Sequence, residues 1–171
     1  MIITAGIFKG QKIIVPDENI TRPTLSKVRM SVFNTLQSMV NFEESSFLDM
    51  FAGSGVMGLE ALSRGFTRAA GIEKNIKAAQ IIKSNYKKFS PCPELIIGDS
   101  LKVTKKMQEK FDVIYIDPPY YSGIYEKSLQ AIKDIADGII ILEHVNDVDL
   151  QGYVTLKQKK YGDKFITFLK N

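Results

Sequence analysis

Four consecutive residues, Asp117, Pro118, Pro119 and Tyr120, have the chemistry to hold an amine. They follow residues 112–116, a mostly apolar run that we predict to be a buried strand. The two prolines remove backbone donors and stiffen the turn, so the Pro118 carbonyl is left as an acceptor near the Asp117 carboxylate. Two acceptors can take both N–H groups of a nucleobase amine, and Tyr120 offers a face for stacking. The alternative is a rigid turn that only ends a core strand.

A glycine-rich turn lies earlier in the chain, between a predicted strand and a predicted helix. Gly53, Gly55 and Gly58 follow the G-x-G-x-x-G pattern, which gives a tight turn and close approach of the backbone to a ligand. Glu73 ends the next predicted strand, twenty residues after Gly53, where its carboxylate can accept hydrogen bonds from ribose hydroxyls. The pattern predicts nucleoside binding. The alternatives are a purely structural turn and a surface carboxylate beside Lys74.

Acidic residues lie at or just after the ends of four of the predicted strands, namely Asp49, Glu73, Asp99 and Asp117. In parallel sheets ligands bind outside the carboxyl ends of the strands, so these acids should meet in one crevice. The glycine pattern alone does not distinguish a dinucleotide from S-adenosylmethionine, but converging carboxylates favour the cationic cofactor. We expect Asp99 to approach the adenine amine; its alternative role, as N-cap of a helix beginning near Ser100, is compatible with that contact.

The elements that must position these residues alternate between strand and helix. We predict strands at 46–50, 69–73, 94–97, 112–116 and 138–143, and helices from the glycine turn to about 64, at 76–88, just after 99 and near 125–135. Such alternation predicts a parallel sheet with helices on both faces. Residues 153–159 and 164–169 alternate without a helix between them and should form an antiparallel hairpin. The predicted fold is α/β and Rossmann-like, with seven strands.

The N-terminal region should extend this core. Residues 1–15 hold two short apolar runs around Lys9-Gly10 and are predicted to form a β-hairpin. An amphipathic helix follows, capped by Thr24 or Ser26, with Val28 among the residues of its apolar stripe. We expect one domain, with an extension over 1–40 and the core over 41–171.

Composition limits the classes of protein to consider. The chain has 171 residues, 44% of them hydrophobic and 25% charged, which is typical of a globular domain. Its longest aliphatic run, 139–142, is far shorter than a membrane span, and the first residues do not resemble a signal peptide. Cys92 is the only cysteine, so neither an internal disulfide nor a multi-cysteine metal site is expected. We therefore expect a cytoplasmic protein with no metal and no membrane partner.

The net charge of +4 is unevenly distributed. Residues 1–40 carry five basic and two acidic groups, and residues 151–171 carry five basic groups and one acidic group, which leaves a net −3 for 41–150. If the two ends meet on one face, they form a surface that attracts phosphate. An ordinary coat of solvated lysines is the alternative.

The motifs together resemble a known family. Asp-Pro-Pro-Tyr after a strand is the signature of amino-methyltransferases, and the chain is similar, nearly end to end, to bacterial 16S rRNA guanine-N2 methyltransferases of the RsmD type. The similar segments are Ile3-Thr4-Ala5-Gly6, Phe8-Lys9-Gly10, Thr21-Arg22-Pro23-Thr24, Val28-Arg29, Phe33-Asn34, 48–55, 58–65, Glu73-Lys74, 117–120 and Tyr161-Gly162-Asp163. Ser26 and Met30 depart from the family, which commonly has Asp and Glu there.

The resemblance implies direct transfer of a methyl group from S-adenosylmethionine to the N2 amine of a guanine in 16S rRNA, free or within the small ribosomal subunit, by a protein that we expect to be monomeric. Carried over by position, the cofactor site would be Asp49, Phe51, Gly53, Gly55, Glu73 and Asp99, and the guanine site Asp117, Pro118, Pro119 and Tyr120. The expected RNA contacts are Lys9, Lys12, Arg22, Arg29, Lys159 and Lys160, although Arg22 and Arg29 would alternatively only organise the start of the N-terminal helix.

Other classes share part of this pattern. A nucleotide-dependent oxidoreductase would explain the glycine turn and Glu73 but not the Asp-Pro-Pro-Tyr turn. A DNA or other RNA amino-methyltransferase, acting on adenine N6 or cytosine N4, would share the chemistry, but a DNA enzyme would normally add a target-recognition domain. A non-catalytic RNA-binding protein is disfavoured because both motifs are intact. We expect His144 to be structural rather than a base.

Overall fold

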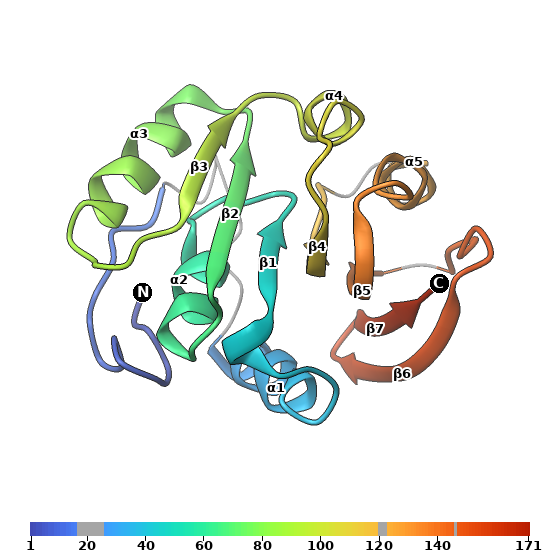
Figure 1. Ribbon diagram of the computed structural model, residues 1–171, viewed down its shortest axis with the longest axis horizontal. Coiled ribbons are helices and arrows are strands. Elements are labelled where there is room, and N and C mark those ends of the chain that lie inside the picture. The colour runs from blue at the N-terminus through green and yellow to red at the C-terminus, as the bar shows by residue number, and fades with distance from the viewer. Residues whose placement is uncertain (17–25, 120–122, 146) are drawn as a thin grey trace.

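Seven strands form one sheet in the order β3-β2-β1-β4-β5-β7-β6 (Figure 1). The computed structural model describes residues 1–16, 26–119, 123–145 and 147–171. The strands are β1 (Ser46–Asp49), β2 (Arg68–Glu73), β3 (Glu94–Ile97), β4 (Phe111–Ile116), β5 (Ala136–His144), β6 (Val154–Tyr161) and β7 (Lys164–Lys170). The predicted strand positions are confirmed to within two residues at each end.

In the described part of the chain, five helices connect or flank these strands. They are α1 (Ser26–Leu36), α2 (Val56–Ser63), α3 (Ile76–Tyr86), α4 (Ser100–Thr104) and α5 (Ile124–Ala131), with a short 3-10 helix η1 at Phe42–Glu44. The helix predicted near 125–135 ends earlier, because residues 132–135 form a turn in which the Ile132 carbonyl accepts from the amides of Ile135 and Ala136. Within the described ranges, no helix is long and apolar enough to span a bilayer.

Strands β1 to β5 run parallel, so their carboxyl ends lie at one edge of the sheet. Strand β7 lies antiparallel between β5 and β6, with Phe165 opposite His144 and Lys164 opposite Tyr161. The turn between β6 and β7 is therefore at the same edge as the carboxyl ends of β4 and β5. The predicted mixed α/β fold with a terminal antiparallel hairpin is confirmed.

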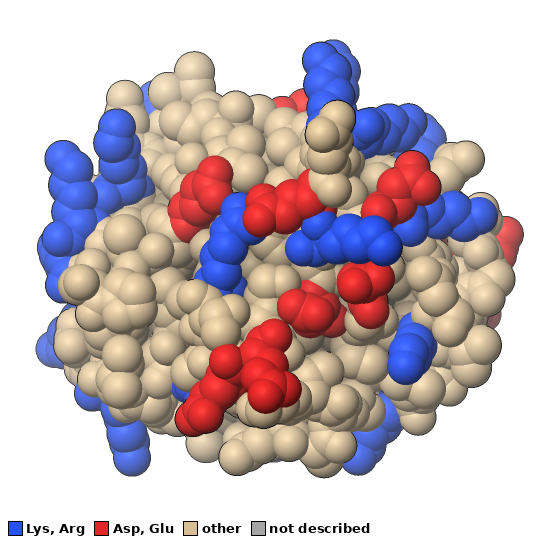
Figure 2. All heavy atoms as spheres, in the orientation of Figure 1, with Lys and Arg blue, Asp and Glu red and all other residues tan. Residues whose placement is uncertain are grey.

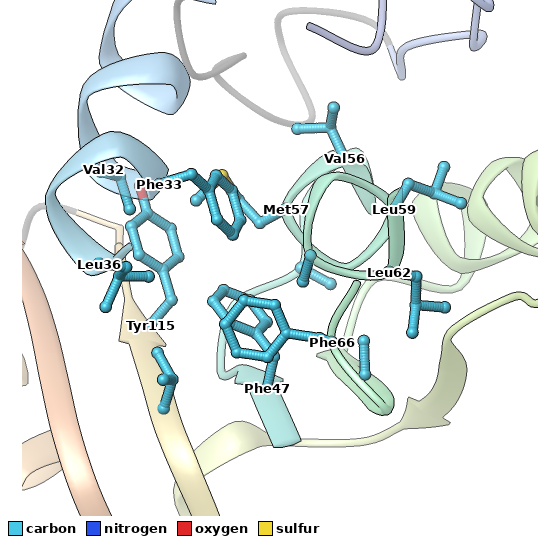
Figure 3. Packing of buried hydrophobic residues seen from close by; sticks show 14 of the residues in the cluster. Val32, Phe33, Leu36, Phe47, Val56, Met57, Leu59, Leu62, Phe66 and Tyr115 are labelled. Carbon is cyan, nitrogen blue, oxygen red and sulfur yellow. The ribbon is translucent and has the colours of Figure 1, made fainter. Parts of the chain in front are cut away.

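Helices cover both faces of the sheet (Figure 1). On one face, Phe33 and Leu36 of α1 and Met57 of α2 pack against Phe47 of β1 and Tyr115 of β4 (Figure 3). The Phe33 and Phe47 rings lie 5.7 Å apart between centroids. On the other face, α4 and α5 pack on a second core that includes residues of β1, β2, β4 and β5. Buried on both sides, the central strands hold the loops that follow them in fixed positions.

The N-terminal segment forms the predicted hairpin only in part. Its two arms pair antiparallel at one bridge, between Ile2 and Lys12, and the amides of Ile3, Gly10 and Ile13 donate to carbonyls of the opposite arm, but no regular strand forms; other backbone groups bond to α2 and α3. The Phe8 amide donates to Ser63 Oγ of α2 at 2.9 Å. Gly6 has a φ of +79°, and a Cβ there would lie 1.6 Å from the Ser63 carbonyl oxygen, so only glycine permits this close approach.

The position of Arg29 contradicts one of the RNA contacts expected from the sequence. Its side chain is buried, and Nε donates to the Glu60 carboxylate of α2 at 3.1 Å, while Nη2 donates to the Ile2 carbonyl at 2.7 Å. Glu60 also pairs with Arg64 and accepts from Thr4. A guanidinium held in this buried network cannot reach RNA phosphate. The alternative holds: Arg29 organises the N-terminal helix.

Candidate active site

A cavity of about 380 Å³ opens at the carboxyl ends of β1, β2 and β4. It is lined by Asp49, Phe51, Ala52, Gly53, Ser54, Val56, Met57, Ile72, Glu73, Lys74, Asn75, Ser100, Tyr115, Asp117, Pro118, Pro119 and Lys164. The two motifs found in the sequence therefore face the same cavity. This follows from the parallel sheet, since neighbouring strands end at one edge.

The glycine turn and Glu73 form one hydrogen-bonded unit. The Gly53 amide donates to Glu73 Oε2 at 2.9 Å, and the Asn75 amide donates to Oε1 at 2.7 Å. Glu73 is 8% exposed, so its carboxylate is fixed by the backbone at the wall of the cavity. Because the Gly53 amide is already used, it is not free to bind a pyrophosphate. The free lone pairs of the Glu73 oxygens suit hydroxyl donors.

Gly55 does not line the cavity, so its place in the motif has a different cause. It precedes α2 with a φ of 76°, and its carbonyl accepts from the Tyr86 hydroxyl at 3.1 Å. A Cβ at this position would lie 2.8 Å from Ile82 and 2.9 Å from Tyr86. The glycine is required by the packing of α3 against the turn rather than by approach of a ligand.

Asp49 lies at the end of β1, buried beside the other carboxylates. Burial raises the pKa of the Asp49 carboxyl from 3.8 to about 8; a hydrogen bond from the Phe51 amide opposes this effect, and the charges of Asp117 and Glu73 add to it. Such a group binds a proton at neutral pH unless a positive charge lies close to it. This edge of the sheet is electrostatically suited to a cation.

Asp117 is linked to a polar network that the sequence did not reveal. Lys164 Nζ lies 3.8 Å from Asp117 Oδ1 and forms an ion pair with Glu143 Oε1. Glu143 Oε2 accepts from the Tyr115 hydroxyl at 2.6 Å. Burial, followed by the Glu143 charge, raises the Tyr115 pKa well above 10, so the phenol keeps its proton and remains a donor. The only signal in the sequence was that Lys164 follows the Tyr161-Gly162-Asp163 turn.

Pro118 and Pro119 line the cavity next to Asp117. Tyr120, expected at the guanine site, and Arg22, expected to contact RNA, lie outside the described residues. The proposed Asp117–Pro118 acceptor pair is therefore on the cavity wall, and the stacking role of Tyr120 stays a prediction.

Asp99 is exposed and does not line the cavity. Its carboxylate accepts from the Lys102 amide at 3.1 Å and caps α4, as its alternative role required. The neighbouring Ser100 reaches the cavity wall instead.

His144 has the structural role expected for it: Nε2 lies 2.8 Å from Thr167 Oγ1, and the ring stacks on Phe165.

Two of the basic residues expected to contact RNA, Lys9 and Lys12, do not share a surface with the other two, Lys159 and Lys160. Lys9 and Lys12 belong to the N-terminal segment, which contacts the ends of α2 and α3 remote from the cavity, whereas Lys159 and Lys160 lie on the edge strand β6. Figure 1 shows these parts on opposite sides of the molecule. Figure 2 shows basic side chains along the left rim, where α3 and the N-terminal segment lie, and mixed charges near the centre. Lys9 and Lys12 therefore do not belong to a basic face that includes β6.

Comparison with known proteins assigns the family. The family model described as "Conserved hypothetical protein 95" matches residues 1–170. Ribosomal RNA small subunit methyltransferase D of Haemophilus influenzae is 31% identical over 172 residues, covering 94% of this chain and 88% of that protein. The protein of the same name from Escherichia coli is 31% identical over 143 residues, covering 81% and 71%. The chain belongs to the RsmD family of methyltransferases.

The fold agrees with that assignment. The structure of yhhF from Escherichia coli, named as a candidate methyltransferase, matches with a TM-score of 0.87 and 24% identity over 99% of this chain and 96% of that chain. The class I methyltransferase fold predicted from the sequence is confirmed. In this RsmD-family chain, the edge of the sheet that carries the cavity is the edge where such folds bind ligands.

Proposed function

We propose that this protein methylates the exocyclic N2 amine of a guanine in 16S rRNA, with S-adenosylmethionine as the methyl donor. The observation that carries the proposal is that Asp117, Pro118 and Pro119 share a cavity with Gly53 and Glu73. The names of the relatives, which are rRNA small subunit methyltransferases, support rRNA as the substrate class.

The residues around the cavity fit S-adenosylmethionine. Three carboxylates, Asp49, Glu73 and Asp117, line it, and burial beside the other two raises the Asp49 pKa to about 8, so a cationic ligand would be stabilised there. Glu73 offers acceptors to both ribose hydroxyls, and Phe51 and Ile72 add apolar surface for an adenine ring. Use of the Gly53 amide by Glu73 disfavours a dinucleotide, whose pyrophosphate would need that donor.

When bound, S-adenosylmethionine supplies a methyl group on a positively charged sulfur, and the amine nitrogen takes this group as the carbon–sulfur bond breaks. The chain's own contribution is orientation. The Asp117 carboxylate and the Pro118 carbonyl accept the two N–H groups of the amine, which directs the nitrogen lone pair away from the base and into the cavity. The proton lost on methylation passes to Asp117 or water. Alignment of this kind accounts for up to about 7–11 kcal/mol of barrier lowering.

The acceptor role is tested with Asp117→Ala and the matched control Asp112→Ala. Asp112 is also an acid of β4, but it lies at the start of the strand and bonds to Ser46, remote from the cavity. Asp117→Ala should lower the rate of methyl transfer at least about a hundredfold while binding of S-adenosylmethionine persists. Asp112→Ala should keep transfer in the folded fraction. Undiminished turnover in Asp117→Ala would contradict the proposed role.

A further inference from the structure

A second cavity, of about 450 Å³, lies between α1 and the edge strand β6. Its lining residues are Lys27, Met30, Ser31, Asn34, Lys159 and Tyr161, and we call it the α1–β6 groove. Lys27, Ser31 and Asn34 recur at three- and four-residue spacing, so they form one stripe of α1. The opposite stripe of α1, which includes Val32 and Phe33, packs into the core.

The groove is held in shape by contacts between its two walls. Lys159 Nζ donates to Ser31 Oγ at 3.0 Å, and the Tyr161 hydroxyl also bonds to Ser31 Oγ. The Lys159 ammonium is therefore fixed in the groove rather than extended into solvent. This contact uses one of the three N–H donors of the ammonium group.

The groove carries positive charge, and neither of its walls has an acidic residue to neutralise that charge. Neither α1 nor β6 contains an acidic residue, whereas β6 has Lys157, Lys159 and Lys160, and α1 has Lys27. Among the residues that the structure describes, no carboxylate forms an ion pair with Lys27 or Lys159. Such a surface attracts a polyanion.

The groove also adjoins the candidate active site. Tyr161 pairs with Lys164 across the β6–β7 hairpin, and Lys164 lines the cavity that holds Asp117. Residues directly opposite in antiparallel strands lie only about 5 Å apart. A strand of nucleic acid that presents a base to Asp117 would therefore pass close to the groove.

We infer that the α1–β6 groove binds the RNA strand beside the target guanine, with phosphate held by Lys27 and Lys159. Lysines give the backbone contacts, while the half-buried Tyr161 ring and the exposed Met30 side chain, which is 47% exposed, offer apolar surface to a flanking base. The inference rests on the proposed function. It keeps Lys159, one of the RNA contacts expected from the sequence, and adds Lys27, which sequence reasoning did not select.

The test compares the double variant Lys27→Gln/Lys159→Gln with Lys133→Gln in binding a 16S rRNA fragment that the wild-type protein methylates. Lys133 is an exposed lysine in the turn between α5 and β5, at the other edge of the sheet from the cavity. We expect the double variant to bind RNA roughly tenfold more weakly and its log–log salt slope to fall by about one to two, because two phosphate contacts are lost. Lys133→Gln should bind like wild type.

A second variant leaves the hydrogen bonds of Ser31 with Lys159 and Tyr161 in place. Asn34→Glu places a carboxylate on the exposed stripe of α1 and should weaken RNA binding, whereas Gln37→Glu, at an exposed position beyond the end of α1 and outside the groove, should not. Unchanged affinity for S-adenosylmethionine will show that the variants are folded. If wild type methylates RNA and the groove variants bind as tightly as their controls, the inference is wrong while the proposed function stands. If wild type binds no RNA, or binds an acidic protein surface instead, both are wrong.

Discussion

The pKa of Asp49 leads to a quantitative prediction about cofactor binding. Burial, with smaller contributions from the neighbouring carboxylates, raises this pKa to about 8, so at pH 6 only about 1% of the free protein has Asp49 ionised. If a cationic cofactor binds beside the carboxylate, affinity should rise about tenfold per pH unit between pH 6 and 7 and level off above pH 8. Binding near pH 6 should release about one proton.

Isothermal titration calorimetry with S-adenosylmethionine, in buffers of different ionisation enthalpy, measures both quantities. Asp49→Asn is the control, because the amide has the same shape and no titration. The ratio of wild-type to variant affinity should therefore increase roughly a hundredfold from pH 6 to pH 9. Parallel pH profiles for the two proteins would refute the link between Asp49 ionisation and the cofactor's charge.

The same group affects stability, with a sign that can be checked. The unfolded chain releases the Asp49 proton near pH 3.8, whereas the folded chain holds it to about pH 8. Stability therefore falls as pH rises through this window, by at most about 4 kcal/mol between pH 5 and pH 8. Asp49→Asn should lack this part of the decline in denaturant unfolding.

Two further predictions concern the buried charge networks. Lys164→Met removes the ammonium partner of Glu143 and the ammonium beside Asp117. Methyl transfer should therefore fall about tenfold or more and its pH profile should shift, with partial rescue by Lys164→Arg; steady-state kinetics from pH 6 to 9 measure this effect. Glu60→Ala removes the carboxylate that the buried Arg29 and Arg64 share and should destabilise the protein by about 3–5 kcal/mol, seen as a drop of roughly 10 °C or more in the thermal unfolding temperature. A pH profile unchanged in Lys164→Met, or a melting temperature unchanged in Glu60→Ala, would contradict the respective interpretation.

Local sequence patterns predicted the elements of the sheet. Each central strand is a short apolar run. For the edge strand β3 (Glu94–Ile97), the first and last residues were both predicted correctly. Convergence of Asp49, Glu73 and Asp117 was also predictable, because parallel strands end at one edge. The periodicity of the terminal segment, with its Gly162 turn, predicted the antiparallel hairpin.

The residue roles that the sequence did not reveal depend on contacts between residues far apart in the chain. Arg29 appeared accessible because its partner, Glu60, lies 31 residues away on another helix. Lys164 and Glu143 meet only through the register of β5 with β7, which the sequence does not specify. For the same reason the sequence did not point to Lys27, because its position beside β6 depends on how α1 packs on the sheet.

The most direct test is methyl transfer from radiolabelled S-adenosylmethionine to small ribosomal subunits, and separately to free 16S rRNA, isolated from a strain that lacks this protein. Digestion to nucleosides then identifies the labelled product. We predict N2-methylguanosine as the labelled nucleoside from the substrate that accepts the methyl group. Label in N6-methyladenosine or N4-methylcytidine, or no label in RNA at all, would contradict a guanine amine held at the end of β4.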